Sequence, residues 1–177
     1  MIEKQATDFK SLVDALENEK MAPDTEALTT LAKALAKTFN VDRDEVAVLD
    51  LRAKDQSLKF VIPEKLAAIG SIPLSSATAL AARTARERRA EVVNNFSNAR
   101  HASVFEGVPL GRDPGEMIQK IMSAPIMDGI NVRGVVQISR KGHSSSEAGP
   151  DFTQNDLRTL TALSPSLHRF LTLCRPD

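Results

Sequence analysis

The feature that most restricts the fold lies in the last third of the chain, where two apolar segments are joined by a tight turn. Residues 117–127 and 130–140 are both rich in Ile, Val and Met, and Asp128-Gly129 stands between them. Asp-Gly is typical of two-residue hairpin loops, whose two central residues need positive φ. The segment therefore predicts two antiparallel strands joined by a hairpin.

A helix with an apolar stripe is predicted to follow this hairpin. Thr153 and Asp156 have the spacing of a capping box at a helix start. Pro165 lacks a backbone N–H, so we expect it to kink the helix near Thr161. The stripe that follows the cap has helical spacing and consists of Leu157, Leu160, Leu163, Leu167, Phe170 and Leu171.

The chain begins with a pattern of two amphipathic helices. Apolar residues recur at helical spacing over residues 2–16. Pro23 breaks this pattern, and Asp24 or Thr25 is a suitable cap for a second helix that ends near Phe39.

The middle of the chain predicts a hairpin followed by a helical crossover. Its expected elements are strands over 45–52 and 58–62, a short helical turn over 65–69, a helix from Ser75 or Ser76 to about Arg88, and a strand over 90–96. Strands joined mainly by hairpins favour an α+β fold with a central, mainly antiparallel sheet of five to six strands and flanking helices. We expect the N-terminal and C-terminal helices to pack together, with residues 1–22 as an N-terminal helix and residues 23–177 as the main domain.

Composition excludes several classes of protein. Lys+Arg and Asp+Glu are equal at 23 each, whereas a nucleic-acid-binding protein usually has a basic face. No apolar run approaches the roughly 18 residues of a membrane span, and residues 1–8 lack the apolar core of a signal peptide. Cys174 is the one cysteine, which excludes an internal disulfide and favours a reducing compartment. We therefore expect a cytoplasmic protein that binds neither nucleic acid nor membrane.

Several of these segments resemble the GAF domain, a PAS-like sensory fold. The resemblance covers residues 25–173 and is carried by the 123–139 hairpin, the Asp151-Phe-Thr-Gln-Asn-Asp-Leu157 helix start, and Ser71-Ile-Pro-Leu-Ser75 with the helix and strand that follow it. It implies a ligand pocket between the sheet and the segments that cover it, 63–72 and 94–117 here. It also implies a homodimer through the terminal helices, with Ile2, Phe9, Leu16 and members of the Leu157–Leu171 stripe in the interface.

Subfamilies with known chemistry fit the sequence poorly. Bilin-binding members attach their chromophore through a cysteine in the covering region, whereas Cys174 lies in the last helix. Free-methionine-sulfoxide reductases of this family need a second cysteine to close their disulfide cycle. Cyclic-nucleotide-binding members carry an Asn-Lys…Phe…Asp-Glu signature, of which Asn95-Phe96 is only a fragment.

The resemblance implies a ligand pocket around the end of the 90–96 strand, without identifying the ligand or cofactor. Its expected residues are Asn94, Asn95, Phe96, His101, Phe105 and Met122. Each has a plainer interpretation as well. His101 is either an axial haem ligand or an exposed loop histidine, the two asparagines contact a ligand or satisfy loop backbone, and Met122 lines the pocket or fills the core.

No catalytic or metal site is predicted. His143 lies in Gly-His-Ser-Ser-Ser without a nucleophile-elbow pattern, and no two histidines share a helical face. Arg83, Arg86, Arg88 and Arg89 form a basic run that is either a phosphate or acidic-partner site or a solvated helix face.

The sequence therefore favours a sensory domain that is not an enzyme, that binds an unidentified small molecule, and that signals through a dimer or a signalling protein partner. The alternative is a dimerisation or protein-interaction module that binds no ligand. A redox or hydrolytic enzyme is a third and weaker interpretation.

Overall fold

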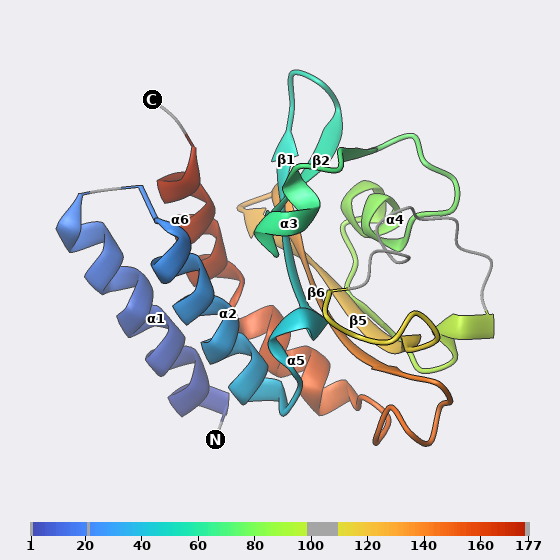
Figure 1. Cartoon of the computed structure of the whole chain (residues 1–177). Coiled ribbons are helices and arrows are strands. Elements are labelled where there is room, and N and C mark those ends of the chain that lie inside the picture. Colours follow the sequence, from blue (N-terminus) through green and yellow to red (C-terminus); the bar gives the residue numbers. More distant parts are fainter. Residues whose placement is uncertain (1, 21, 99–109, 176–177) are drawn as a thin grey trace.

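The computed structural model describes residues 2–20, 22–98 and 110–175, and side-chain positions within these ranges from residue 8 onward, apart from Asn98. It shows a six-stranded antiparallel sheet in the order β3-β2-β1-β6-β5-β4, with helices on both faces (Figure 1). The strands are β1 (Val46–Arg52), β2 (Ser57–Ile62), β3 (Ser71–Pro73), β4 (Glu91–Val93), β5 (Met117–Asp128) and β6 (Asn131–Gly142). The helices are α1 (Ile2–Glu19), α2 (Thr25–Phe39), α3 (Glu64–Ala67), α4 (Leu80–Glu87), α5 (Gln154–Ala162) and α6 (Ser164–Cys174), with 3-10 turns η1 (Arg43–Glu45) and η2 (Phe96–Asn98). The predicted α+β class and sheet are confirmed.

One face of the sheet carries the main hydrophobic core. Helices α1, α2, α5 and α6 lie together on this side (Figure 1), and α1 packs against the other three. Arg169 of α6 forms ion pairs with Asp14 and Glu17 of α1, the latter with an Nη2–Oε2 distance of 2.6 Å. The N-terminal and C-terminal helices therefore pack together as predicted.

This core changes the expected dimer interface. The whole Leu157–Leu171 stripe is buried in the chain's own core, together with Phe9. Leu16 is half-buried against the same core, and the side chain of Ile2 lies outside the described residues. The assignment of the stripe and Phe9 to an intermolecular interface is wrong, because their apolar surface is already used within the chain.

The last helix is two helices rather than one kinked helix. Helix α5 starts at the capping box of Thr153 and Asp156, as predicted, and ends at Ala162. Helix α6 begins at Ser164, with Pro165 in its first turn, where the missing N–H costs nothing. The Ser164 hydroxyl accepts a hydrogen bond from the backbone N–H of Met127 in β5, at 2.9 Å. The break therefore also anchors the start of α6 to the sheet.

Three further boundaries differ from the sequence predictions. The predicted 90–96 strand is shorter, since β4 covers only Glu91–Val93 and Phe96 begins η2. Helix α4 begins at Leu80 rather than after Ser76, because Arg86 holds residues 74–76 as a loop by donating to the carbonyls of Leu74 and Ser76. In the β5–β6 hairpin, Asp128 pairs with Asn131, so the turn residues are Gly129 and Ile130 rather than Asp128 and Gly129. Only Gly129 of the two has positive φ, at 61°, which is the pattern of a type II′ turn.

Strand β6 lies at the centre of the sheet, and Gly134 on it has no room for a side chain. A Cβ there would lie 2.3 Å from the Leu49 carbonyl oxygen and 2.6 Å from Leu171 Cδ1. Glycine at this position therefore lets β1, β6 and α6 approach closely.

We expect Gly134→Ala to lower the free energy of unfolding by about 2 kcal/mol or more, because the added methyl overpacks against backbone that cannot move away. Urea denaturation followed by circular dichroism measures this, since the chain lacks Trp and Tyr. The control is Gly111→Ala, where the added Cβ meets nothing within 4 Å and only the positive φ of 83° is strained. A Gly134→Ala protein as stable as the control would contradict this description of the core.

Candidate functional site

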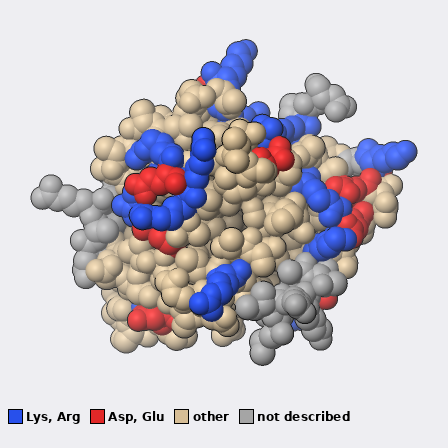
Figure 2. All heavy atoms as spheres, turned by 180° about the vertical axis from the view of Figure 1, so that it is seen from behind, with Lys and Arg blue, Asp and Glu red and all other residues tan. Residues whose placement is uncertain are grey.

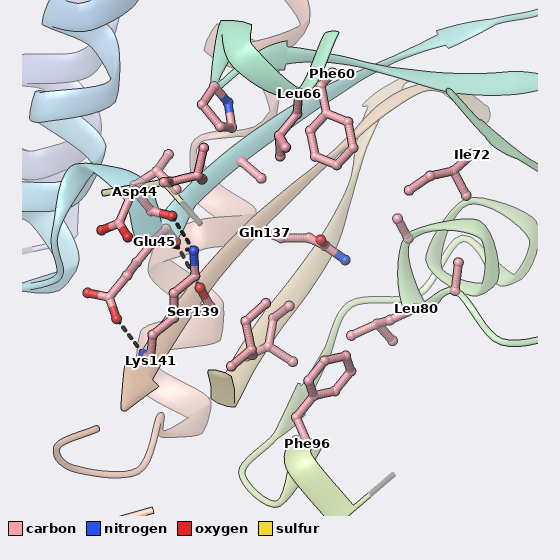
Figure 3. A pocket seen from close by; sticks show the side chains of 18 residues that line it. Asp44, Glu45, Phe60, Leu66, Ile72, Leu80, Phe96, Gln137, Ser139 and Lys141 are labelled. Atoms are coloured by element: carbon pink, nitrogen blue, oxygen red, sulfur yellow. Dashed lines mark hydrogen bonds and ion pairs between the residues drawn. The ribbon is translucent and has the colours of Figure 1, made fainter. Parts of the chain in front are cut away.

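A cavity lies on the face of the sheet opposite the main core. Its apolar wall comes from β2, α3, β3, α4, η2 and β5, and consists mainly of Phe60, Leu66, Ile72, Leu80, Phe96 and Ile121. Its polar residues gather on β6 and η1, as Figure 3 shows, and are Asp44, Glu45, Gln137, Ser139 and Lys141. The cavity volume is about 70 Å³. This is below the roughly 300 Å³ at which drug-sized ligand sites begin, so the space has room only for a molecule smaller than those.

Alternation along β6 determines which residues face this cavity. Side chains of a strand point to opposite faces in turn. Val136 and Ile138 are buried in the main core, whereas Gln137 and Ser139 line the cavity. The strand is thus covered on both faces, and its polar side chains belong to the cavity.

A buried chain of hydrogen bonds orients Gln137. Its Nε2 donates to Ser123 Oγ at 3.1 Å, and Ser123 Oγ lies 2.7 Å from Thr84 Oγ1. The Thr84 hydroxyl donates to the Leu80 carbonyl at 2.9 Å, so its proton is used and Ser123 donates to Thr84. The Gln137 side chain therefore projects into the cavity (Figure 3), with its amide nitrogen held by Ser123.

Arg112 fastens residues 110–116, of which Leu110 lines the cavity. Its guanidinium pairs with Asp42 at 2.7 Å, with both carboxylate oxygens of Asp44, and with Glu116 at 3.0 Å. Asp42, Asp44 and Glu45 lie close enough together to share a cation, and Arg112 occupies that role. The ion pairs join residues 110–116 to η1, beside the polar end of the cavity.

Glu45 is the buried carboxyl of this cluster, with 7% of its surface exposed. Its oxygens accept from the backbone N–H groups of Asp42, at 2.8 Å, and Lys141, at 2.5 Å. Burial nevertheless raises the pKa of Glu45 above its ordinary value of 4.5, against the opposing effect of these hydrogen bonds and of Arg112. Burial likewise lowers the pKa of Lys141, which also lines the cavity.

The raised pKa of Glu45 has a consequence for stability. The folded state binds this proton more tightly than the unfolded state, so the stability that Glu45 contributes is present below pH 4.5 and is lost as pH rises through the folded-state pKa. We expect the unfolding free energy of the wild type, minus that of Glu45→Gln, to fall as pH rises from about 4 to 7. Urea denaturation at several pH values measures it, and a difference that grows with pH would contradict the assignment.

The structure brings only part of the sequence-predicted site together. Phe96 is buried and lines the cavity. Met122 does not line it and belongs to the main core, since it follows Ile121 on β5 and points to the other face. Asn94 hydrogen-bonds the backbone of Phe152 in the loop before α5, and Asn95 is exposed. The predicted residues His101 and Phe105 lie outside the described residues.

We expect Asn94→Ala to cost about 1–2 kcal/mol of stability, because it leaves the N–H and C=O of Phe152 without their partner. The two bonds are 2.9 and 3.0 Å long. The exposed neighbour provides the control, since Asn95→Ala should change the unfolding free energy by less than about 0.5 kcal/mol. Equal effects of the two substitutions in urea denaturation would rule out the bridging role of Asn94.

The basic run makes local contacts rather than forming a single basic face. Arg83 pairs with Glu91 at 2.9 Å, Arg89 pairs with Glu87 at 3.1 Å, and Arg86 holds the 74–76 loop. Acidic and basic side chains are interspersed over the face seen in Figure 2.

Cys174 lies away from the cavity. It packs against the main core on the other face of the sheet, and burial raises the pKa of its thiol to about 12. None of the described helices is long and apolar enough to cross a membrane.

A family model for the GAF domain matches residues 25–167 of the chain. The chain belongs to the GAF domain family. GAF domains are generally sensory or regulatory, and the family agrees with the antiparallel sheet and the helices on both of its faces. No curated protein matches the chain.

Solved structures with similar folds come from proteins of several kinds. The GAF domain of an Acinetobacter phosphoenolpyruvate-protein phosphotransferase is 14% identical, with a TM-score of 0.70 over 97% of this chain and 93% of that one. A GAF domain of the corresponding Coxiella burnetii protein is 11% identical, with a TM-score of 0.63 over 94% of each chain. Free methionine-R-sulfoxide reductase from Neisseria meningitidis, in complex with its substrate, is 15% identical, with a TM-score of 0.64 over 99% of this chain and 90% of that one. At these identities the likeness concerns the fold alone. The similar structures include GAF domains taken from phosphotransferases and a methionine-sulfoxide reductase.

Proposed function

We propose that this chain is a sensory GAF domain that binds a small molecule in the cavity between β6 and its covering segments. The observation that carries the proposal is the Gln137 amide, which a buried hydrogen-bond chain aims into a largely apolar cavity. A polar group in an apolar cavity is costly unless it has a partner. A ligand with a hydrogen-bond donor and a small apolar part satisfies both the amide and the wall.

The signal passes through β6 to the terminal helices. Gln137 contributes to the cavity, and its neighbours Val136 and Ile138 pack in the core formed with α1, α2, α5 and α6. A ligand shifts an equilibrium only by its differential affinity for two states. A ligand that repositions β6 therefore acts on the helical layer, which is the surface that we propose for a signalling partner.

The homodimer remains a prediction, with its interface unassigned. The stripe expected to form it stabilises the chain's own core. A dimer would then use surfaces outside this stripe. Light scattering at a protein concentration of tens of micromolar gives the molecular mass and so distinguishes a dimer from a monomer. The cytoplasmic location remains a prediction from composition.

We propose that a thiol-based reductase activity is not the function of this chain. Its single cysteine has a raised pKa and lies on the face of the sheet opposite the cavity. A disulfide cycle needs a thiolate and a resolving thiol within reach.

A screen of small carboxamide, alcohol and carboxylate fragments tests ligand binding. The full chain is labelled with ¹⁵N, and the side-chain amide of Gln137 is observed by NMR. We expect at least one fragment to shift this signal saturably, and Gln137→Leu to weaken its binding about tenfold, which corresponds to one buried hydrogen bond of about 1.4 kcal/mol.

Asn95→Ala is the matched control, because Asn95 is exposed and outside the cavity lining. It should leave fragment affinity unchanged. Fragments that bind the wild type and Gln137→Leu equally would refute the proposed site. A chain that binds no fragment at all would favour the alternative, an interaction module whose cavity holds no ligand.

A further inference from the structure

A cluster of possible metal ligands lies outside the cavity, on the outer side of the Arg112 ion pairs. Asp113 and Glu116 come from the covering segment, and His143 directly follows β6. One ligand atom from each lies within 4.8 Å of the other two. The sequence predicts no metal site, because it offers no pair of histidines on one helical face. The fold brings together residues that are about 30 positions apart.

The local backbone places the two carboxylates on one side of a turn. The N–H of Glu116 donates to the carbonyl of Asp113 at 3.0 Å, which closes the turn. Gly115 within this turn allows the imidazole to approach, since a Cβ there would lie 2.8 Å from His143 Nδ1. The ring therefore packs directly on the turn that carries both acids.

The distances between these groups exceed those of direct hydrogen bonds. His143 Nε2 is 4.0 Å from Asp113 Oδ2 and 3.8 Å from Glu116 Oε1. An N–H···O hydrogen bond spans about 2.7–3.2 Å. Two ligands that share a tetrahedral Zn²⁺, each about 2.1 Å from it, lie about 3.4 Å apart. Small side-chain adjustments suffice to close the three ligands around one ion.

Arg112 also orients the carboxylate of Glu116. Its Oε2 accepts from Arg112 Nη1 at 3.0 Å, which leaves Oε1 directed at His143. Outer partners of this kind hold metal-ligating carboxylates in place. Arg112 itself is held by Asp42 and Asp44, so it neutralises those carboxylates as well as Glu116.

We propose that Asp113, Glu116 and His143 form a binding site for a first-row divalent cation of the Zn²⁺ type, which fastens the covering segment to the end of β6. One imidazole and two carboxylates suit such a cation, and the partial exposure of the ligands leaves coordination positions for water. The cation adds a second attachment beside Arg112 between residues 110–116 and the sheet. The site does not require that the cavity bind a ligand.

The test uses the full chain, freed of metal with a chelator and titrated with ZnCl₂ in a buffer without phosphate. Calorimetry gives the stoichiometry, and ¹⁵N NMR follows the three imidazole rings of the chain. We expect one Zn²⁺ per chain and a shift of the His143 ring nitrogens. His143→Ala removes one of the three ligands, and Asp113→Asn replaces a carboxylate by a neutral amide, so each should weaken binding by about tenfold or more.

The control is His168→Ala, which should leave Zn²⁺ affinity unchanged because His168 faces Asp128 at 3.8 Å, at the opposite end of β5 from Glu116. Asp113 is exposed, so Asp113→Asn tests the site without disturbing a buried contact. Hydrogen exchange over residues 110–116 gives a second readout, which Zn²⁺ should slow in the wild type and leave unchanged in Asp113→Asn.

Zn²⁺ that binds His143→Ala as tightly as the wild type would overturn the proposal, and so would titration without any shift of the His143 ring. Exchange over residues 110–116 that is equally fast with and without Zn²⁺ would overturn the fastening role.

Discussion

The structure depends on the burial of strand β6 on both of its faces. β6 lies between β1 and β5, and Gly134 allows the close approach that this position requires. Because side chains alternate along a strand, Val136 and Ile138 complete the helical core, whereas Gln137 and Ser139 are left to the cavity. The same strand thus joins the part of the molecule that provides stability to the part that we assign to ligand binding.

Ion pairs of Arg112 hold residues 110–116 in place beside the polar end of the cavity. Arg112 gathers carboxylates from η1 and from its own segment, and the buried Glu45 is stabilised by backbone N–H groups as well. A buried charge needs partners of this kind, since losing one partner leaves the other uncompensated. The ion pairs therefore fix residues 110–116 against η1 at the polar end of the cavity, whose remaining wall is largely apolar.

Much of the fold could be predicted from local patterns, and the site only in part. The β5 and β6 strands, the capping box at Thr153 and the helix break at Pro23 all follow from residue type and spacing. The sequence could not show on which face of β5 Met122 lies, because polar residues occur at both parities of the strand, Gln119 and Ser123 at one and Lys120 at the other, and so do not mark its phase. The sequence could have shown that Gln137 and Ser139 share one face of their strand, since they alternate with the apolar Val136 and Ile138. The contacts of Arg112 with Asp42 and Asp44 span about 70 positions and depend on tertiary structure, which no local pattern encodes.

The most direct test of the central claim is a crystal structure of the chain soaked with the fragment that binds most tightly. We expect electron density for the fragment between Gln137 and Leu80, beneath the covering segment and within hydrogen-bonding distance of the Gln137 amide. Density in the groove beside Leu28 and Glu64, outside the covered cavity, with the space next to Gln137 filled only by water, would contradict the account.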